Sequence, residues 1–222
     1  MAGRSHFALT LGFNHALTDS ELEHIKMTSG ALDIMRVPTM VREAHARAQQ
    51  LQFLQSSEPT VGRLLSVLSS IVPLGGRVLE LGTGAGVGLA WIVHGLRERT
   101  DVDVISVELD RERAEIVRDA AWPSWVSFIS GNGAELIETL GSFDLIFPDT
   151  PGGKVYNLEA TIAALRPGGM LLLDDMELPK RGNAARRARI KSVRNQLFRD
   201  PRLHCAELAY SSGLILAARG RF

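Results

Sequence analysis

The sequence predicts an α/β fold in which a mostly parallel, doubly wound sheet carries helices on both faces. Three observations support this prediction. Short apolar segments of strand length alternate with helical segments between residues 77 and 198. A glycine-rich turn follows the first predicted strand, and acidic residues stand at the ends of several strands. In a sheet of this kind, ligands bind at the carboxyl ends of the strands.

The N-terminal third of the chain is predicted to be helical. A helix start lies at Thr18–Ser20, with acidic residues in the first turn. A second helix is expected from about Thr39 to Gln55, and a third begins near Pro59. We therefore expect residues 1–72 to form an N-terminal helical extension and residues 73–222 to form one compact domain.

The first predicted strand covers Val78–Leu81 and leads into a turn that contains Gly82, Gly84 and Gly86. Glycine lacks a Cβ, so the backbone N–H groups before the next helix can approach a ligand closely. The spacing is G-x-G-x-G, whereas the dinucleotide fingerprint requires glycine where this chain has Val87. The turn predicts a bound ligand, and the alternative is a packing turn without one.

Further strands and helices follow in regular alternation. The predicted strands cover residues 102–107, 126–129, 143–147, 170–173, 203–208 and 214–218. The predicted helices cover residues 110–121, 155–165 and 183–198, with one short helix that ends near residue 140. The last two strands are expected to form a hairpin.

Acidic residues end the predicted strands, or follow them directly, at five positions. These are Glu80, Glu108, Asp149, Asp174 and Asp175. The carboxyl ends of parallel strands meet at one edge of a sheet, so these side chains are expected to gather at a common site. Five such positions favour a binding edge over ordinary surface solvation.

The bulk composition narrows the class of partner. The formal net charge is +0, which argues against general binding to nucleic acid or to a membrane surface. The single Cys205 allows neither an internal disulfide nor a cysteine zinc cluster. No long apolar segment of membrane-spanning or signal type occurs, so a cytoplasmic protein is expected.

Several segments, taken in order, carry a resemblance to a known family. They are Gly62–Leu65, Val78–Gly84, Ser106–Asp110, Phe143–Asp149, Leu165–Asp175, Asp200–Leu203 and Gly213–Ala217. Residues 59–222 thereby resemble the small class I S-adenosylmethionine (SAM)-dependent O-methyltransferases related to catechol and caffeoyl-CoA O-methyltransferases. The resemblance implies a Rossmann-like sheet of seven strands in which the last strand runs antiparallel.

The resemblance also implies a SAM site. The implied contact residues are Glu80, Gly82, Thr83, Gly84, Gly86, Glu108, Leu109, Asn132, Gly133, Ala134 and Asp149. The glycine turn and Glu80 would hold the amino-acid end of SAM, Glu108 the ribose hydroxyls, and Asn132 the adenine. Two positions depart from the family: Asn132 replaces a usual aspartate, and Gly88 replaces a frequent serine.

Three carboxylates match the family's metal positions, namely Asp149, Asp174 and Asp175. Oxygen ligands of this kind suit Mg²⁺, which would orient and acidify a substrate hydroxyl. The segment after Asp149 lacks the family's second acid, and Lys154 is displaced by about two positions. The alternative is that Asp149 contacts SAM while the aspartate pair caps the next segment.

Asp149 and Lys154 are the candidate catalytic residues. The lysine is a possible general base if burial beside a cation lowers its pKa, and the alternative is a solvated loop lysine. Residues 180–202 contain nine Lys or Arg and one acid, a local charge of 9 − 1 = +8. In this segment, Arg187, Lys191 and Arg194 form a basic line that is predicted to bind an anionic acceptor. The alternative is a solvated helix face.

The sequence thus predicts SAM-dependent methyl transfer to a hydroxyl group of a small molecule, assisted by Mg²⁺. We also expect a homodimer that binds neither nucleic acid nor membrane. Two alternatives stay open: a metal-independent methyltransferase acting on oxygen or nitrogen, and a catalytically silent SAM-binding scaffold.

Overall fold

The computed structural model describes residues 37–179 and 183–221, and residues 38–222 form one compact unit. The helix start predicted at Thr18–Ser20 lies outside the described residues. The compact unit includes the two helices that precede the first strand. The expected boundary between an extension and a domain after residue 72 stays a prediction.

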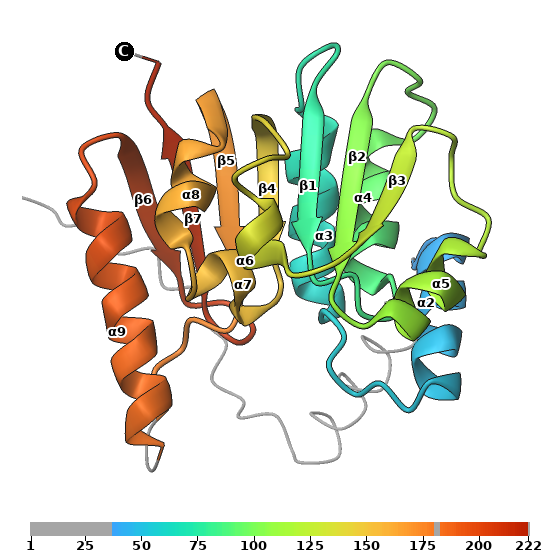
Figure 1. Ribbon diagram of the computed structural model, residues 1–222, viewed down its shortest axis with the longest axis horizontal. Coiled ribbons are helices and arrows are strands. Elements are labelled where there is room, and N and C mark those ends of the chain that lie inside the picture. Colours follow the sequence, from blue (N-terminus) through green and yellow to red (C-terminus); the bar gives the residue numbers. More distant parts are fainter. Residues whose placement is uncertain (1–36, 180–182, 222) are drawn as a thin grey trace, which may run out of the picture. The chain divides into compact units, whose positions relative to one another are not determined.

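A seven-stranded sheet forms the centre of the unit (Figure 1). Its strands are β1 (Arg77–Leu81), β2 (Asp103–Glu108), β3 (Val126–Ser130), β4 (Phe143–Pro148), β5 (Leu165–Leu173), β6 (Leu203–Leu208) and β7 (Leu214–Arg219). Their order is β3-β2-β1-β4-β5-β7-β6, and β7 runs antiparallel to both of its neighbours. The predicted architecture is confirmed, including the antiparallel last strand and the terminal hairpin.

Helices cover both faces of the sheet. They are α2 (Thr39–Gln50), α3 (Pro59–Ser70), α4 (Val87–Leu96), α5 (Arg111–Arg118), α6 (Gly133–Leu136), α7 (Pro151–Lys154), α8 (Leu158–Ala163) and α9 (Ala184–Arg199). In Figure 1, α3 and α4 lie behind the sheet, whereas α6 and α8 lie in front of it. No helix among the described residues is long and apolar enough to cross a membrane.

The centre of the sheet combines burial with a reversal of strand order. All residues of β4 are buried, as are the last four residues of β1. The chain builds outward from β1 to β2 and β3, and then returns to place β4 on the other side of β1. Ligands bind at such a reversal point, beyond the carboxyl ends of the strands.

Three boundaries differ from the sequence prediction for identifiable backbone reasons. Helix α2 ends at Gln50 rather than Gln55, because Gln52 adopts a positive φ of 50°. The helix predicted over 155–165 is shortened to α8, which begins only after Asn157 because that residue has φ 63°. Strand β5 already begins at Leu165, and the predicted turn before residue 170 lies within the strand as an irregularity in its register.

Candidate active site

A cleft of about 940 Å³ opens at the carboxyl ends of the central strands. All five acidic strand-end residues predicted to gather do line it: Glu80, Glu108, Asp149, Asp174 and Asp175. Residues 55–58 before α3, the segment 149–156 and one side of α9 complete the wall. The cleft therefore joins distant parts of the chain at the predicted edge of the sheet.

The glycine turn forms the floor of one end of the cleft. Gly82, Gly84 and Gly86 have φ values of 97°, 54° and 82°, a left-handed region that favours glycine. The N–H of Asp149 donates to the carbonyl of Leu81 at 2.8 Å, so the end of β4 is tied beside the turn. Glycine is needed here for backbone conformation as well as for ligand access.

The ring of Phe53 lies over this turn. A Cβ at Gly84 would come within 2.8 Å of the Phe53 ring. The guanidinium of Arg113, which belongs to α5, lies 4.7 Å from the centre of the same ring. Phe53 lines the cleft at its glycine end.

Glu80 is buried beneath the turn, with 1 % of its surface exposed. Its Oε2 accepts a hydrogen bond from the Ser106 hydroxyl at 2.6 Å, and the Ser106 and Thr83 hydroxyls lie 2.6 Å apart. Burial raises the pKa of the Glu80 carboxyl well above its ordinary value, and the Ser106 hydrogen bond opposes that shift. A cationic ligand group beside Glu80 would therefore be favoured.

The Glu80 carboxyl group leaves no room for a side chain at position 88, which is glycine. A Cβ at Gly88 would lie 2.5 Å from Glu80 Oε1, and 3.4 Å from the Ser57 hydroxyl. The serine frequent at this position in the resembling family would therefore collide with the carboxyl group. Ser57, which precedes α3, brings a hydroxyl to the same place from another part of the chain.

The Glu108 carboxylate lies at the end of β2, with 5 % of the residue exposed. Its Oε2 accepts the Gly84 N–H at 2.8 Å. Its Oε1 accepts the Asp110 N–H at 3.0 Å and pairs with Arg113 Nη1 at 3.2 Å. The carboxylate thus connects the glycine turn with the start of α5.

The predicted adenine residues surround the start of α6. Asn132 caps this short helix, because its Oδ1 accepts the Ala134 N–H at 3.0 Å. Its amide nitrogen donates to Glu135 at 2.8 Å. Leu109 is 72 % exposed at the cleft and leaves an apolar surface open, while Gly133 and Ala134 also line the cleft.

The segment 150–157, most of which lines the cleft, forms a tight, anchored turn. Gly153 has φ 80°, and a Cβ there would come within 2.4 Å of Leu81. The Thr161 hydroxyl donates to the Gly153 carbonyl at 2.8 Å, and the Gly153 N–H donates to Tyr156 at the same distance. The glycines therefore allow close packing against β1 in this segment.

Lys154 is buried by this turn, with 9 % of its surface exposed, so the alternative of a solvated loop lysine is wrong. Its Nζ donates to the main-chain carbonyl of Asp174 at 3.1 Å. The side chain lines the cleft between the ends of β4 and β5. It is a positive charge set among acidic residues.

Asp149 lies next to the glycine turn and accepts a hydrogen bond from the Ser57 hydroxyl at 3.2 Å. Burial raises the pKa of the Asp149 carboxyl to about 6, while the charge of Lys154 acts in the opposite direction. Asp174, which is 6 % exposed, also has a raised pKa because of burial. Both residues line the cleft, so their raised pKa values make them candidates for proton exchange with a ligand.

The two aspartates that follow β5 are directed differently. Asp174 Oδ1 accepts hydrogen bonds from the Ser212 hydroxyl and from the Asp175 N–H. Asp175 has φ 64°, its side chain is 59 % exposed, and its carboxylate lies 3.6 Å from Arg186. Within residues 37–179 and 183–221, no three His, Cys, Asp or Glu side chains are arranged to hold a metal ion.

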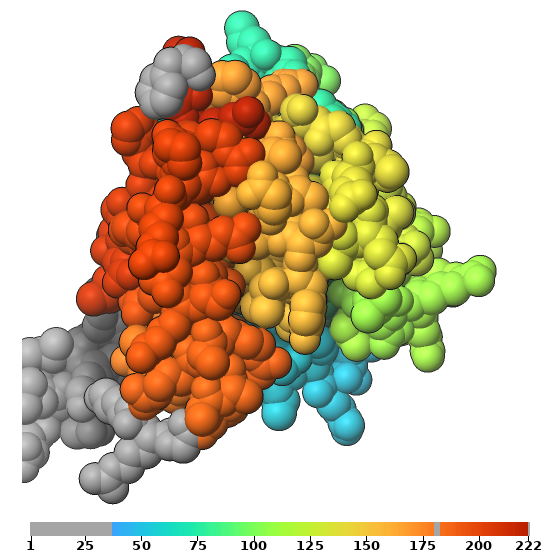
Figure 2. Space-filling model, turned by 60° about the vertical axis from the view of Figure 1, so that its left-hand side comes forward, coloured from blue at the N-terminus to red at the C-terminus, as the bar shows by residue number. Residues whose placement is uncertain are grey.

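Helix α9 supplies the outer wall through a different face from the one expected. Arg186, Arg189, Ile190 and Val193 line the cleft. In the expected basic line, Arg187 donates to the Pro179 carbonyl and Arg194 pairs with Glu207 at 2.7 Å. Figure 2 shows the α9 surface beside the residues that follow β4.

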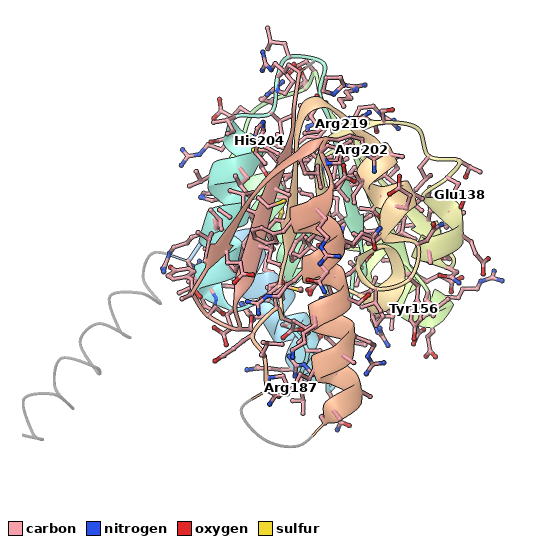
Figure 3. The ribbon with its side chains drawn as sticks, turned by 90° about the vertical axis from the view of Figure 1, so that its left-hand side faces the viewer. Glu138, Tyr156, Arg187, Arg202, His204 and Arg219 are labelled. Carbon is pink, nitrogen blue, oxygen red and sulfur yellow. The ribbon has the colours of Figure 1, made fainter. Side chains whose placement is uncertain are left out.

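The side chains labelled in Figure 3 lie toward two opposite ends of the sheet. Arg187 and Tyr156 lie toward the carboxyl ends of the parallel strands, where the cleft opens. Arg202, His204 and Arg219 lie toward the opposite end. Arg187 therefore lies apart from Arg202 and Arg219.

Four polar residues of the site were missed by sequence reasoning: Ser57, Ser106, Arg113 and Ser212. A hydroxyl within an apolar strand could have drawn attention to Ser106, because buried polar groups need partners. The other three come from segments whose position beside the cleft depends on the tertiary fold. No local sequence pattern identifies these three residues as part of the site.

Three comparisons place this geometry among known proteins. Residues 79–176 match a family described as a methyltransferase domain. An inferred O-methyltransferase of Mycobacterium sp. (strain JLS) is 33% identical over 172 residues, which cover 72% of this chain and 78% of that protein. A second, from Mycobacterium marinum (strain ATCC BAA-535 / M), is 30% identical over 195 residues, covering 82% and 85%.

Solved structures share the fold. An O-methyltransferase of tomaymycin synthesis from Streptomyces achromogenes, in complex with SAM, has a TM-score of 0.73 at 18% identity, covering 86% of this chain and 96% of that one. A Bacillus cereus O-methyltransferase in complex with SAH has a TM-score of 0.71 at 21% identity, covering 89% and 99%.

Proposed function

Because the chain belongs to the class I SAM-dependent O-methyltransferases, we propose that it methylates a hydroxyl group of a small molecule in the cleft described above. The observation that carries this proposal is the arrangement of the cleft. One end holds a glycine turn between two buried glutamates, and the other end begins beside that turn at the half-buried Asp149 and extends to the buried Lys154. A methyl donor at the first end would direct its sulfonium toward the second.

For the donor end, we assign roles to residues that line the cleft. Buried Glu80 would accept hydrogen bonds from the SAM ammonium, whose charge would offset the cost of burying the carboxylate. The glycine turn would hold the rest of the amino-acid end. Glu108 would bind the ribose hydroxyls, with Arg113 giving up its bond to Oε1.

At the adenine end, the proposal relies on backbone as well as side chains. Leu109 would cover one face of the adenine ring with its exposed side chain. Asn132 is engaged by the cap of α6 together with the Ala134 N–H, which supports a main-chain contact from Gly133 and packing by Ala134 rather than a free amide. The replacement of the usual aspartate by Asn132 then keeps the cap intact.

For the acceptor end, we assign the proton acceptor to Asp149 or Lys154. SAM already carries an activated methyl group, so the protein has to align the acceptor oxygen, remove its proton and exclude water. Both residues lie in the wall where that oxygen would approach the sulfonium. Either could act as a general base at this position.

The expected Mg²⁺ site fits the geometry poorly. Carboxylate oxygens are suitable ligands in principle. However, Asp175 pairs with Arg186, and Asp174 Oδ1 is already engaged by two donors. The ammonium of Lys154 also lies among these carboxylates, where it would repel a divalent ion. We therefore assign no step of the reaction to a metal ion.

The acceptor is further proposed to carry a negative charge. Arg186 and Arg189 line the cleft on its α9 side, and Arg189 makes no ion pair with a residue in the described part of the chain. Ile190 and Val193 beside them offer an apolar surface. An acceptor with an apolar body and a carboxylate or phosphate would match this wall.

The test is methyl transfer from SAM with a labelled methyl group to panels of phenols, aliphatic hydroxy acids and amines. We expect SAH formation and a methyl ether with a hydroxylated acceptor, fastest among the anionic members. A product methylated on nitrogen would favour the alternative chemistry. Tight SAM binding with no product in any panel would favour a silent scaffold.

A further inference from the structure

We propose that the Lys154 ammonium itself supplies the positive charge at the acceptor oxygen, so that methyl transfer proceeds without a divalent metal. This inference rests on the proposed function and adds to it. Asp149 then takes the proton, while Lys154 stays charged throughout. Four features of the site support this division of roles.

The first feature is the fixed position of the lysine. Lys154 is 9 % exposed, and its Nζ is held by the Asp174 carbonyl at 3.1 Å. The backbone before it is anchored by the Thr161 hydroxyl at 2.8 Å and packed against Leu81. A group held in this way is oriented before the substrate arrives, as electrostatic catalysis requires.

The second feature is unused donor capacity. A lysine ammonium has three N–H donors, and within the described ranges the Asp174 carbonyl is the single hydrogen-bond acceptor of Lys154. The side chain nevertheless lines the cleft. A buried charged donor without further partners favours a ligand that accepts hydrogen bonds. An oxygen that gains negative charge is such a ligand.

The third feature is charge balance. The carboxyl groups of Asp149 and Asp174 lie close enough to Lys154 for its charge to oppose the rise in their pKa values. In a metal-dependent site, a divalent ion would balance such carboxylates. Here a covalently attached cation already does so, and adding an ion would place two positive charges in the same space.

The fourth feature is the direction of the third aspartate. Asp175 adopts a left-handed backbone conformation, with φ 64°, and its side chain is 59 % exposed beside Arg186. Asp175 lines the cleft but is engaged by Arg186, which leaves the first two aspartates together with a lysine. This set of residues suits a hydrogen-bonded oxygen better than a six-coordinate ion.

The reaction then balances as follows. The acceptor O–H bond breaks and its proton passes to the Asp149 carboxylate. The acceptor oxygen forms a bond to the methyl carbon of SAM, and the S–CH₃ bond breaks with its electron pair left on sulfur. The Lys154 N–H groups hydrogen-bond the oxygen as negative charge develops, and neutral SAH sulfur remains.

The direct test uses Mn²⁺ as a spectroscopic probe and needs no turnover. EDTA-treated wild-type protein is mixed with SAH and Mn²⁺, and bound Mn²⁺ is measured by electron paramagnetic resonance. We expect the spectrum of free Mn²⁺, together with full SAH binding by calorimetry. Stoichiometric bound Mn²⁺ would overturn the inference, whatever the outcome of the acceptor panels.

The second arm tests the charge of the lysine. With the acceptor that reacts fastest in the panels, EDTA should leave the rate unchanged, and Lys154→Met should lower kcat by about 100-fold or more while SAH affinity is kept. Lys154→Arg should retain part of the rate. Arg118→Met, which removes an exposed cation at the end of α5 outside the cleft, serves as the matched control. Loss of activity in EDTA with rescue by Mg²⁺, or full activity of Lys154→Met, would contradict the inference.

These experiments distinguish a failure of the proposed function from a failure of the role given to Lys154. Absence of methyl transfer by the wild-type protein, with SAH bound, would refute the proposed function. Methyl transfer that requires Mg²⁺ would refute only the role of Lys154. If Lys154→Met does not fold, the Mn²⁺ spectrum and the EDTA response of the wild-type protein still decide the question.

Discussion

The donor end and the acceptor end of the cleft are built by different means. At the donor end, the glycine turn and the two glutamates come from the ends of adjacent strands, β1 and β2. Main-chain groups provide several of the contacts, such as the Gly84 N–H on Glu108. At the acceptor end, side chains converge from segments far apart in the chain, including Ser57, Lys154 and Ser212.

This difference indicates which part of the site can vary. A carboxylate at a strand end is positioned by the ladder of hydrogen bonds in the sheet, so its place follows from the fold. A side chain in a loop is positioned by the particular contacts of that loop. The donor end should therefore tolerate few substitutions, whereas the acceptor end can change its chemistry through the segment 150–157 and α9.

The largest expected effect concerns the acceptor end. Asp149→Asn should lower kcat by about 10²–10³-fold, because an amide cannot take the acceptor proton. SAH affinity, measured by calorimetry, should change little. Asp119→Asn, at the exposed end of α5, is the matched control. Equal losses of kcat and SAH affinity would show that the two ends are not separable in this way.

The corresponding change at the donor end is Glu108→Ala. It should weaken SAH binding by about 100-fold, because hydrogen bonds to a charged group contribute about 1.5–3 kcal/mol each. The variant also frees the Gly84 N–H. Glu112→Ala, an exposed carboxylate in the first turn of α5, should bind SAH normally. Unchanged binding by Glu108→Ala would remove the basis for the proposed donor end.

The pH dependence should distinguish the ends as well. Because burial raises the pKa of Asp149 to about 6, its proton-accepting form predominates above that pH. Below it, kcat should fall by about tenfold per pH unit, as for a single ionisation. SAH binding should not follow the same profile. A rate that is flat from pH 5 to pH 7 would exclude Asp149 as the base.

The same ionisation should affect stability with a defined sign. A carboxyl group whose pKa is higher in the folded state than its ordinary 3.8 binds its proton more tightly when folded. Its contribution to stability is therefore largest at low pH and is lost as pH rises toward about 6. Urea unfolding of Asp149→Asn should lack this component of the pH dependence.

The smallest of these effects concerns Gly88. Gly88→Ser should weaken SAH binding by about tenfold, since overpacking costs about 1–3 kcal/mol and the new Cβ would displace Glu80. The contact distance from that Cβ to Glu80 Oε1 would be 2.5 Å without rearrangement. Calorimetry together with a thermal melt separates lost affinity from lost stability. Tighter SAH binding would mean that a serine hydroxyl is accommodated as in the resembling family.

Much of the fold and of the donor end could be predicted from the sequence. Alternating apolar segments specify strands and helices, and Glu80 and Glu108 follow directly from the strand ends. The acceptor end was harder, because burial of Lys154 depends on a positive φ at Gly153 and on packing against Leu81. The orientation of Asp175 depends likewise on its own backbone and on Arg186. Neither is encoded in a local pattern.

The central claim is that the donor and acceptor ends face each other across one cleft. A crystal structure with bound SAH tests it most directly. We predict the ribose on Glu108, the amino-acid end between Glu80 and the glycine turn, and the sulfur directed toward Asp149 and Lys154. SAH bound outside this cleft, or with its sulfur directed away from both residues, would contradict the account.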